Sequence, residues 1–374
     1  MQKIPNFVTL MLAGVWVLKY CCCEADPDRR QQQHLKQDLL HNYTSTVSPQ
    51  GATNQVTVSL SFALIAVLAV EETSQIFRIS GAMNLIWTDP WLTWDDSNGI
   101  RELRFAPSEI WTPNVIIPNG VGDKISSLSA SMPINVQHTG EAMMFIISEF
   151  EMICDLDVTW YPYDEQVCHM AVLSMFEFQL QLGDQSRSKI FSAYFTGSSE
   201  WNLVNSTIGV KYAGSAPYID IEFRLQRLSI FYTLSVIFPM CLLSFLNACV
   251  FLLPAASGEK VSFLVSIFVS GAVFLNYIND AIPKSGNTSR LTIYLVLLLS
   301  QSALALLVTI LVMNIHHQQG ALVCFFRRKN AVHQSEGPGK DSSIKNEKVA
   351  ERLDNFFFVL FVSMAALSIM VFYV

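Results

Sequence analysis

The chain has 374 residues, of which 51% are hydrophobic and only 15% are charged, and its formal net charge is −7. Soluble globular proteins carry about 25% charged residues, so the composition argues against a cytosolic enzyme and also against intrinsic disorder. A net negative charge also argues against a nucleic-acid binder. The charge is uneven: residues 24–227 hold 24 acidic and 12 basic side chains, whereas residues 316–353 hold 4 acidic and 7 basic ones.

A short apolar run opens the chain. Lys3 precedes the run Phe7–Leu18, and Lys19 and three cysteines follow it. The run is too short to cross a bilayer comfortably, and a basic residue before a short apolar core is typical of a secretory signal peptide. We therefore predict a cleaved signal peptide over residues 1–23, which places residues 24–227 outside the cell. The alternative, an uncleaved anchor, would reverse this topology.

The region 24–227 shows the alternation of apolar and polar residues that is typical of half-buried β-strands. The alternation covers residues 56–64, 176–182 and 219–225, and Asn-Gly turn signals lie between such segments. A polar, glutamine-rich segment over 28–41 precedes them and is a candidate helix. We predict an extracellular, all-β domain made of two packed sheets.

Cysteine usage supports secretion of this region. Of the eight cysteines, only Cys154 and Cys168 lie within the predicted extracellular domain beyond the cleavage site. Two isolated cysteines in an oxidising compartment predict one disulfide bond between them. Sequons at Asn42 and Asn205 predict glycosylation, because Asn-X-Ser/Thr is the acceptor pattern in secreted proteins.

Four long uncharged stretches follow the β region, over residues 228–258, 261–279, 291–315 and 355–374. An α-helix needs roughly 20 residues to cross a bilayer, and each stretch is about that long or longer. We predict three transmembrane helices within 228–315, a fourth over 354–374, and a lipid bilayer around them. The basic segment 316–353 becomes cytoplasmic by the positive-inside rule, which returns the C-terminus to the outside.

One face of the second predicted span is unlike a surface that lipid would cover. Residues at steps of three and four lie on one side of a helix, and this side carries Ser262, Ser266, Val269, Val273, Asn276 and Asp280. A symmetric ring of copies could enclose a pore with this face, and rings of Glu259 and Asp280 would concentrate cations at its two mouths. Val269 and Val273 would form an apolar girdle that gates by dewetting. Alternatively, the serines only pack against neighbouring helices.

No motif of a common enzyme or cofactor site occurs in the chain. The patterns GxSxG, Walker A, HExxH and paired CxxC are absent. The adjacent residues His316 and His317 point in different directions on a helix, so they do not predict a metal site. We predict neither an enzyme nor a bound cofactor or metal.

The segment Cys154–Cys168 resembles the signature loop of the Cys-loop receptors. Thirteen residues separate its cysteines, and its centre reads Tyr-Pro-Tyr-Asp. Further segments match in order: Trp87–Trp94, Ile110–Pro113, Gln226–Thr233 and Ser257–Lys260. The resemblance covers about residues 50–374 and is nearest to the branch of the nicotinic acetylcholine receptors. It implies a pentamer of identical or homologous subunits, in which a small-molecule ligand at the subunit interfaces opens a central pore lined by the second span.

The same resemblance implies selectivity for cations. Anion-selective relatives carry Pro-Ala-Arg before the pore helix, whereas residues 255–259 of this chain read Ala-Ala-Ser-Gly-Glu. We expect Glu259 to be the main determinant of selectivity, and we expect the neighbouring Lys260 to face away from the lumen.

The resemblance also implies residues that couple the two parts of the chain. Arg227, just before the first span, is expected to pair with an acidic residue between the first two strands, for which Glu72 is the candidate. The centre of the cysteine loop is expected to press on residues 282–290 and so to link the sandwich to the pore helix. The residues of that centre are Tyr161, Pro162, Tyr163 and Asp164.

The agonist site is where the chain departs from the family pattern. An aromatic cage holds the quaternary ammonium of acetylcholine. The positions that the resemblance assigns to this cage carry Ala82, Pro118 and Met175, with Phe176 beside Met175, and the expected vicinal cysteines between Tyr212 and Tyr218 are missing. Only Phe176, Tyr212 and Tyr218 supply rings, so classical acetylcholine is not the expected ligand. Alternatively, Met175 and Phe176 only pack within a strand.

Three functions remain compatible with the sequence. The chain is a cation channel of identical subunits, a subunit that needs a partner chain to complete the ligand site, or a receptor-like scaffold that does not conduct. The serine-rich face and Glu259 favour a channel over a scaffold. Co-purification of a second chain would favour the partnered subunit.

Overall fold

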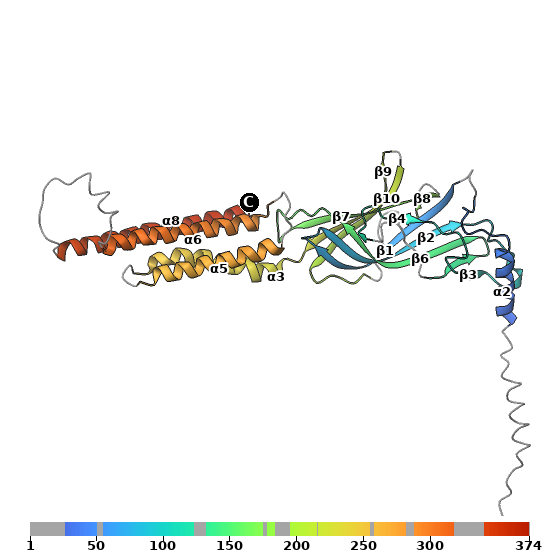
Figure 1. The fold of residues 1–374 in the computed structure, drawn as a ribbon, viewed down its shortest axis with the longest axis horizontal. Helices are drawn as coiled ribbons and strands as arrows, with labels where there is room; N and C mark the ends of the chain where they lie inside the picture. The colour runs from blue at the N-terminus through green and yellow to red at the C-terminus, as the bar shows by residue number, and fades with distance from the viewer. Residues whose placement is uncertain are drawn as a thin grey trace, which may run out of the picture.

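The computed structural model describes residues 27–50, 55–122, 132–174, 178–183, 195–214, 216–254, 258–281, 288–317 and 340–373. The predicted signal peptide and most of the predicted cytoplasmic segment lie outside these residues. Figure 1 shows two parts arranged end to end, a β-sandwich and a bundle of long helices, with the C-terminal end of the chain beside their junction.

The β part begins with helix α2 (Pro27–Leu40), which lies at the end of the sandwich remote from the helix bundle (Figure 1). This confirms the helix predicted over residues 28–41. Two sheets follow, one with strand order β3-β5-β6-β2-β1-β8 and one with order β4-β7-β10-β9. The strands are β1 (Val56–Glu71), β2 (Ile76–Thr88), β3 (Glu102–Phe105), β4 (Val115–Ile116), β5 (Ile134–Gln137), β6 (Glu141–Ile153), β7 (Glu165–Ser174), β8 (Phe178–Leu182), β9 (Trp201–Ala213) and β10 (Ala216–Arg227).

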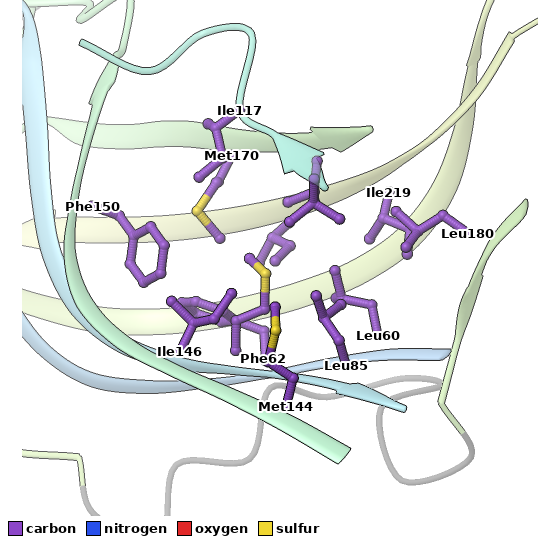
Figure 2. Packing of buried hydrophobic residues seen from close by; sticks show 14 of the residues in the cluster. Leu60, Phe62, Leu85, Ile117, Met144, Ile146, Phe150, Met170, Leu180 and Ile219 are labelled. Atoms are coloured by element: carbon purple, nitrogen blue, oxygen red, sulfur yellow. The ribbon is translucent and has the colours of Figure 1, made fainter. Parts of the chain in front are cut away.

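Alternation along the strands builds the core between the two sheets. Successive residues of a strand point to opposite faces, so every second residue from Val56 to Leu64 is buried. Figure 2 shows Phe62 and Ile146 of the six-stranded sheet within the same core as Met170 and Ile219 of the four-stranded sheet. The predicted two-sheet sandwich is therefore confirmed.

A disulfide bond closes the loop between β6 and β7. Cys154 directly follows β6 and is joined to Cys168 of β7, with 5.2 Å between their Cα atoms. This confirms the bond predicted from cysteine usage. The enclosed residues, 155–167, are called the cysteine loop below.

Within the part of the chain that the structure describes, four helical segments are long and apolar enough to cross a membrane: Ile230–Leu252, Lys260–Asp280, Arg290–His316 and Lys348–Tyr373. They agree with the four predicted spans. The last three correspond to α5 (Lys260–Ala281), α6 (Arg290–His317) and α8 (Lys340–Tyr373). Helix α8 begins before the predicted fourth span of 354–374, at Lys340.

The first span is not one regular helix. It consists of α3 (Ile230–Tyr232), the π-helical turn η4 (Thr233–Ile237), α4 (Phe238–Cys249) and the 3₁₀ turn η5 (Val250–Leu252). Pro239 lacks an N–H group and its ring crowds the preceding turn, which accounts for the widened turn η4 directly before it. The span nevertheless remains continuous, as helices in a bilayer tolerate such a break.

Candidate functional site

Helix α5, together with Glu259 directly before it, presents every predicted pore residue on one exposed face. Within the single chain, Val269 is 53% exposed and Val273 is 62% exposed, although both are large apolar residues in the middle of a span. The full set of exposed residues on this face is Glu259, Ser262, Ser266, Val269, Val273, Asn276 and Asp280. The chain's own helices therefore leave this face uncovered.

The opposite face of α5 packs against the other helices. Leu264, Ile267 and Ile278 are buried there. Gly271 lies on the same side, and a Cβ atom added to it would come within 3.1 Å of Leu299 in α6. The glycine thus permits close packing of α5 on α6, which fixes the direction of the exposed face.

Serine hydroxyl groups along this side of α5 donate to carbonyl oxygens of the same helix. Ser266 Oγ donates to the carbonyl oxygen of Ser262 at 2.9 Å, and Ser270 Oγ donates to that of Ser266 at 2.8 Å. Both Ser262 and Ser266 are exposed within the single chain. Their hydroxyl oxygens remain able to accept hydrogen bonds from water.

Charged residues stand at the two ends of the exposed face. Glu259 precedes the helix and Asp280 lies in its last turn, and both are exposed. The helical rise of 1.5 Å per residue separates them by about 30 Å, which is about the thickness of the hydrocarbon core of a bilayer. The face therefore has an acidic group near each membrane surface.

Lys260 points away from that face, as expected from the sequence. Its side chain is only 1% exposed, and Nζ donates to Asp354 Oδ2 of α8 at 2.7 Å. No local sequence pattern points to this partner, which lies 94 residues later in the chain.

A second cluster lies where the sandwich meets the helices. Arg227 ends β10, and its side chain is 1% exposed. Nε and Nη2 donate to the two carboxylate oxygens of Asp164 at 2.7 and 3.0 Å, and Nη1 donates to Glu72 Oε1 at 2.6 Å. The structure thus brings together the expected pair Arg227 and Glu72 and adds a bidentate pair with Asp164.

Aromatic rings surround the guanidinium group of Arg227. Its Cζ atom lies 4.2 Å from the ring centre of Trp201, 4.8 Å from that of Tyr161 and 5.7 Å from that of Tyr232. Burial alone would lower the pKa of Arg227, but its hydrogen bonds and charge attraction to Asp164 and Glu72 outweigh burial and raise that pKa. The arginine therefore stays charged inside this cluster. Burial also raises the pKa of Tyr161.

The side chain of Asp164 is held by partners within the β part of the chain. Both its oxygens accept hydrogen bonds from Arg227, and it also accepts a hydrogen bond from Gln166 at 2.6 Å. Its expected contact with residues 282–290 stays a prediction, because residues 282–287 lie outside the described residues. Arg227 ends in a rigid fork of donors, and the buried carboxylate is the group that fits it. Asp164 therefore belongs to the arginine cluster.

Other residues of the cysteine loop contact the helices directly. Tyr163 Oη shares a hydrogen bond of 3.0 Å with Thr233 Oγ1. The Arg290 backbone N–H donates to the Thr159 carbonyl at 3.1 Å, and its guanidinium lies 3.6 Å from the ring centre of Trp160. Of the expected contact segment 282–290, residues 282–287 lie outside the described residues. Pro162 follows Tyr161 through a cis peptide bond.

The residues assigned to the agonist site do not meet within one chain. Tyr212 is 71% exposed on β9, and Tyr218 is half-buried on β10. Pro118 is exposed after β4, whereas Ala82 lies on β2 of the other sheet. Met175 and Phe176 lie outside the described residues.

A polar cluster lies on the hairpin of β9 and β10. Asp220 is buried, and its Oδ2 atom lies 2.6 Å from Lys211 Nζ and 3.0 Å from His169 Nδ1. The hydrogen bond to Asp220 raises the pKa of Lys211. Both sequon residues, Asn42 and Asn205, are exposed, so their glycosylation stays a prediction that accessibility permits.

Comparisons with known proteins agree with this architecture. Residues 32–229 match the model of the neurotransmitter-gated ion-channel ligand binding domain, and residues 236–323 match that of the neurotransmitter-gated ion-channel transmembrane region. The chain belongs to the neurotransmitter-gated ion-channel family. It is a Cys-loop receptor of the nicotinic acetylcholine receptor-like branch, a multi-pass plasma-membrane protein whose N-terminal ligand-binding domain is extracellular.

Individual relatives are receptor subunits. The chain is 30% identical over 335 residues to the neuronal acetylcholine receptor subunit non-alpha-2 of Carassius auratus, covering 84% of this chain and 71% of that one. It is 29% identical over 293 residues to the acetylcholine receptor subunit alpha-1-B of Xenopus laevis, covering 75% and 64%. It is 29% identical over 304 residues to the human neuronal acetylcholine receptor subunit alpha-5, covering 78% and 64%. The matched part thus spans 64–71% of the length of these relatives.

Proposed function

We propose that the chain is a subunit of a pentameric, cation-selective, ligand-gated channel whose pore is lined by the exposed face of α5. The observation that carries this proposal is the position of the seven residues of that face, which are all exposed and polar or acidic at both ends. Five copies around an axis would cover the face with water and neighbouring subunits instead of lipid.

Glu259 is the proposed determinant of cation selectivity. It is exposed near the inner end of the face, while the positive charge of Lys260 is buried against Asp354. A ring of five carboxylates without compensating lysines would hold a negative potential at the inner mouth and attract cations. Asp280 would act in the same way at the outer mouth.

The arginine cluster, made of Arg227, Glu72, Asp164 and the surrounding rings, is the proposed link between ligand and pore. Strand β10 carries Tyr218 near the hairpin tip and ends at Arg227, and α3 begins at Ile230. A displacement of the hairpin would therefore pass along one strand into the first span. Tyr161, Tyr163 and their neighbours in the cysteine loop would pass it to the helices in parallel.

The ligand is proposed to differ from classical acetylcholine. Ala82 and Pro118 offer no aromatic ring to a quaternary ammonium, and the vicinal cysteines are missing from the short hairpin. Tyr212 and Tyr218 remain as aromatic groups near the tip of the β9–β10 hairpin, where the register places them on opposite faces. The proposed subunit interface would place this hairpin against the six-stranded sheet of a second subunit, which carries Ala82 on β2.

The same observation favours a second candidate function, an accessory subunit. If a different chain supplied a ring at the position of Ala82, a complete cage would form only in a mixed pentamer. Co-purification of a homologous chain with this one would support that candidate. The non-conducting scaffold is the remaining alternative and is decided by the experiment below.

A polar substitution in the apolar girdle tests the channel proposal. We expect Val269→Ser to wet the girdle and to produce a standing cation current without ligand, measured by voltage clamp while external sodium is exchanged for a large organic cation. Val359→Ser is the matched control, because Val359 is 66% exposed on α8 but lies on a different helix. A current that follows chloride would contradict the role of Glu259. Surface-expressed protein without any current would favour the accessory subunit or the scaffold.

A further inference from the structure

We infer that Asp354, in the fourth span, is a positioning residue for the charge of the pore. It holds the Lys260 ammonium inside the bundle and so preserves the negative field of Glu259 at the inner mouth. The effect on conduction rests on the proposed function, whereas the positioning of Lys260 does not.

The pair is buried within a single chain. Lys260 is 1% exposed and the Asp354 side chain is 10% exposed, with 2.7 Å between Nζ and Oδ2. Lysine is almost never fully buried unless it is paired. The second carboxylate oxygen, Oδ1, is buried without a hydrogen-bond partner among the described residues. Lys260 is therefore the group that compensates this carboxylate.

Aromatic packing fixes the direction in which Asp354 points. Phe357 follows it by three residues and so lies on the same side of α8. The ring of Phe357 lies 5.8 Å from that of Phe251 in η5, and the ring of Phe361 lies 5.0 Å from the same ring. These contacts anchor the face of α8 that carries Asp354 against the inner end of the bundle.

Glu259 and Lys260 are consecutive residues with opposite charges and opposite environments. Glu259 is exposed, and Lys260 is buried. Consecutive positions on a helix differ by about 100° in direction, which separates the two side chains only while Lys260 is held in place. A lysine without its partner has a flexible stem that can carry the ammonium to the nearest water, beside Glu259.

Single-channel recording in the Val269→Ser background tests the effect on the pore. We expect Asp354→Asn to lower the inward sodium conductance at least about twofold, because five added positive charges weaken the cation-attracting field. The double variant Asp354→Asn/Lys260→Met removes the freed charge and is expected to restore the conductance. Glu351→Gln is the matched control, an exposed acidic position one turn earlier on α8. An unchanged conductance in Asp354→Asn, or a double variant as low as the single one, would overturn this effect.

Amine labelling tests the positioning of Lys260 without any current. The purified full-length assembly is treated with an N-hydroxysuccinimide ester of acetate, and labelling of Lys260 is compared with that of exposed Lys348 by peptide mass spectrometry. We expect several-fold weaker labelling of Lys260 than of Lys348 in the parent and comparable labelling in Asp354→Asn. Equal labelling in the parent, or no gain in the variant, would overturn the inference.

The two experiments fail separately. Absence of a standing current in Val269→Ser contradicts the proposed function, while labelling still decides whether Asp354 holds Lys260. A standing current with no response to Asp354→Asn contradicts this inference alone. Where Asp354→Asn does not assemble, the parent comparison of Lys260 with Lys348 decides the claim.

Discussion

The arginine cluster and the proposed ligand region, which contains Tyr212 and Ala82, differ in how much of each a single chain completes. Around Arg227, a buried guanidinium finds two carboxylates and three rings within one chain. In the ligand region, Tyr212 is 71% exposed, and Ala82 lies on the opposite sheet. The first region is closed by the chain's own fold, and the second is open.

The closed arginine cluster therefore contributes to the stability of the chain, whereas the open region contributes little to it. Burial makes each contact of the arginine cluster costly to remove, because a charge left without its partner remains desolvated. An open surface tolerates substitution, because water replaces each lost contact. Substitution of the exposed Tyr212 is thus expected to cost less stability than substitution of a residue in the arginine cluster. Four variants, two of them double, sharpen the comparison.

The largest expected effect comes from Arg227→Gln. It removes the charge that compensates Asp164 and Glu72, and breaking such a buried pair costs about 3–5 kcal/mol. We expect a large fall in the thermal midpoint of the purified protein, or loss of surface expression. The control is Arg224→Gln in the same strand, where the arginine is 49% exposed and lies 3.6 Å from Glu222, so about 1 kcal/mol or less is expected. Equal losses in both variants would contradict the contrast.

The disulfide bond ranks next. Replacing Cys154 and Cys168 with serine opens a 15-residue loop, which the chain-entropy model values at about 3 kcal/mol. We expect reduced surface expression, because the loop also carries Tyr161 and Tyr163 to the helices. The matched control replaces the free cysteines Cys241 and Cys249 with serine, and it is expected to change expression little. A larger loss in the control would contradict the assignment.

A smaller effect is expected from restoring rings to the ligand region. Each aromatic ring beside a quaternary ammonium contributes about 0.5–2 kcal/mol. We expect the combined variant Ala82→Trp/Pro118→Tyr to bind acetylcholine several-fold more tightly than the parent, measured by calorimetry on the assembled protein. Thr88→Trp, an exposed position on the same strand as Ala82, controls for added aromatic surface. Parent protein that already binds as tightly as the variant would contradict the missing cage.

The smallest effect belongs to Lys211→Gln on the hairpin. The pKa of Lys211 is raised above its usual 10.5 by the hydrogen bond to Asp220, so its contribution is complete below pH 10.5 and is lost as pH rises through the raised pKa. The lysine side chain is 51% exposed, and His169 also binds Asp220, so the loss is about 1 kcal/mol or less. Thermal midpoints of parent and Lys211→Gln are measured at pH 8 and above pH 10.5. The difference between the two proteins should shrink at the higher pH. A gap that widens there would contradict the sign.

Local patterns in the sequence predicted most of the fold. Alternation from Val56 to Leu64, the isolated cysteine pair and the uncharged stretches each depend on residues close together in the chain. The stripe on α5 is of the same kind, since its members recur every three or four residues. Such signals depend on strand and helix geometry alone, and so they can be read without knowing how the elements pack.

The missed contacts join residues far apart in the chain. Asp164 and Arg227 are 63 residues apart, and Lys260 and Asp354 are 94 residues apart. Trp201 lies opposite Arg227 only because a register shift between Arg224 and Leu225 moves the pairing of β9 and β10 by one residue. A regular pairing of β9 and β10 would place Asn202, not Trp201, opposite Arg227. The register shift that brings Trp201 there has no local sequence pattern that predicts it.

The most direct test of the central claim is chemical modification of the exposed face of α5 in an open channel. Ser266→Cys in the Val269→Ser background is exposed to a small cationic thiol reagent, and Val359→Cys in the same background serves as the lipid-facing control. The Val269→Ser channel without an added cysteine is treated in the same way. It shows any effect of the reagent on Cys241 and Cys249, the free cysteines of the first span. The account predicts irreversible block of the standing current in Ser266→Cys and none in Val359→Cys. Block in Val359→Cys with an unchanged current in Ser266→Cys would contradict a pore lined by α5.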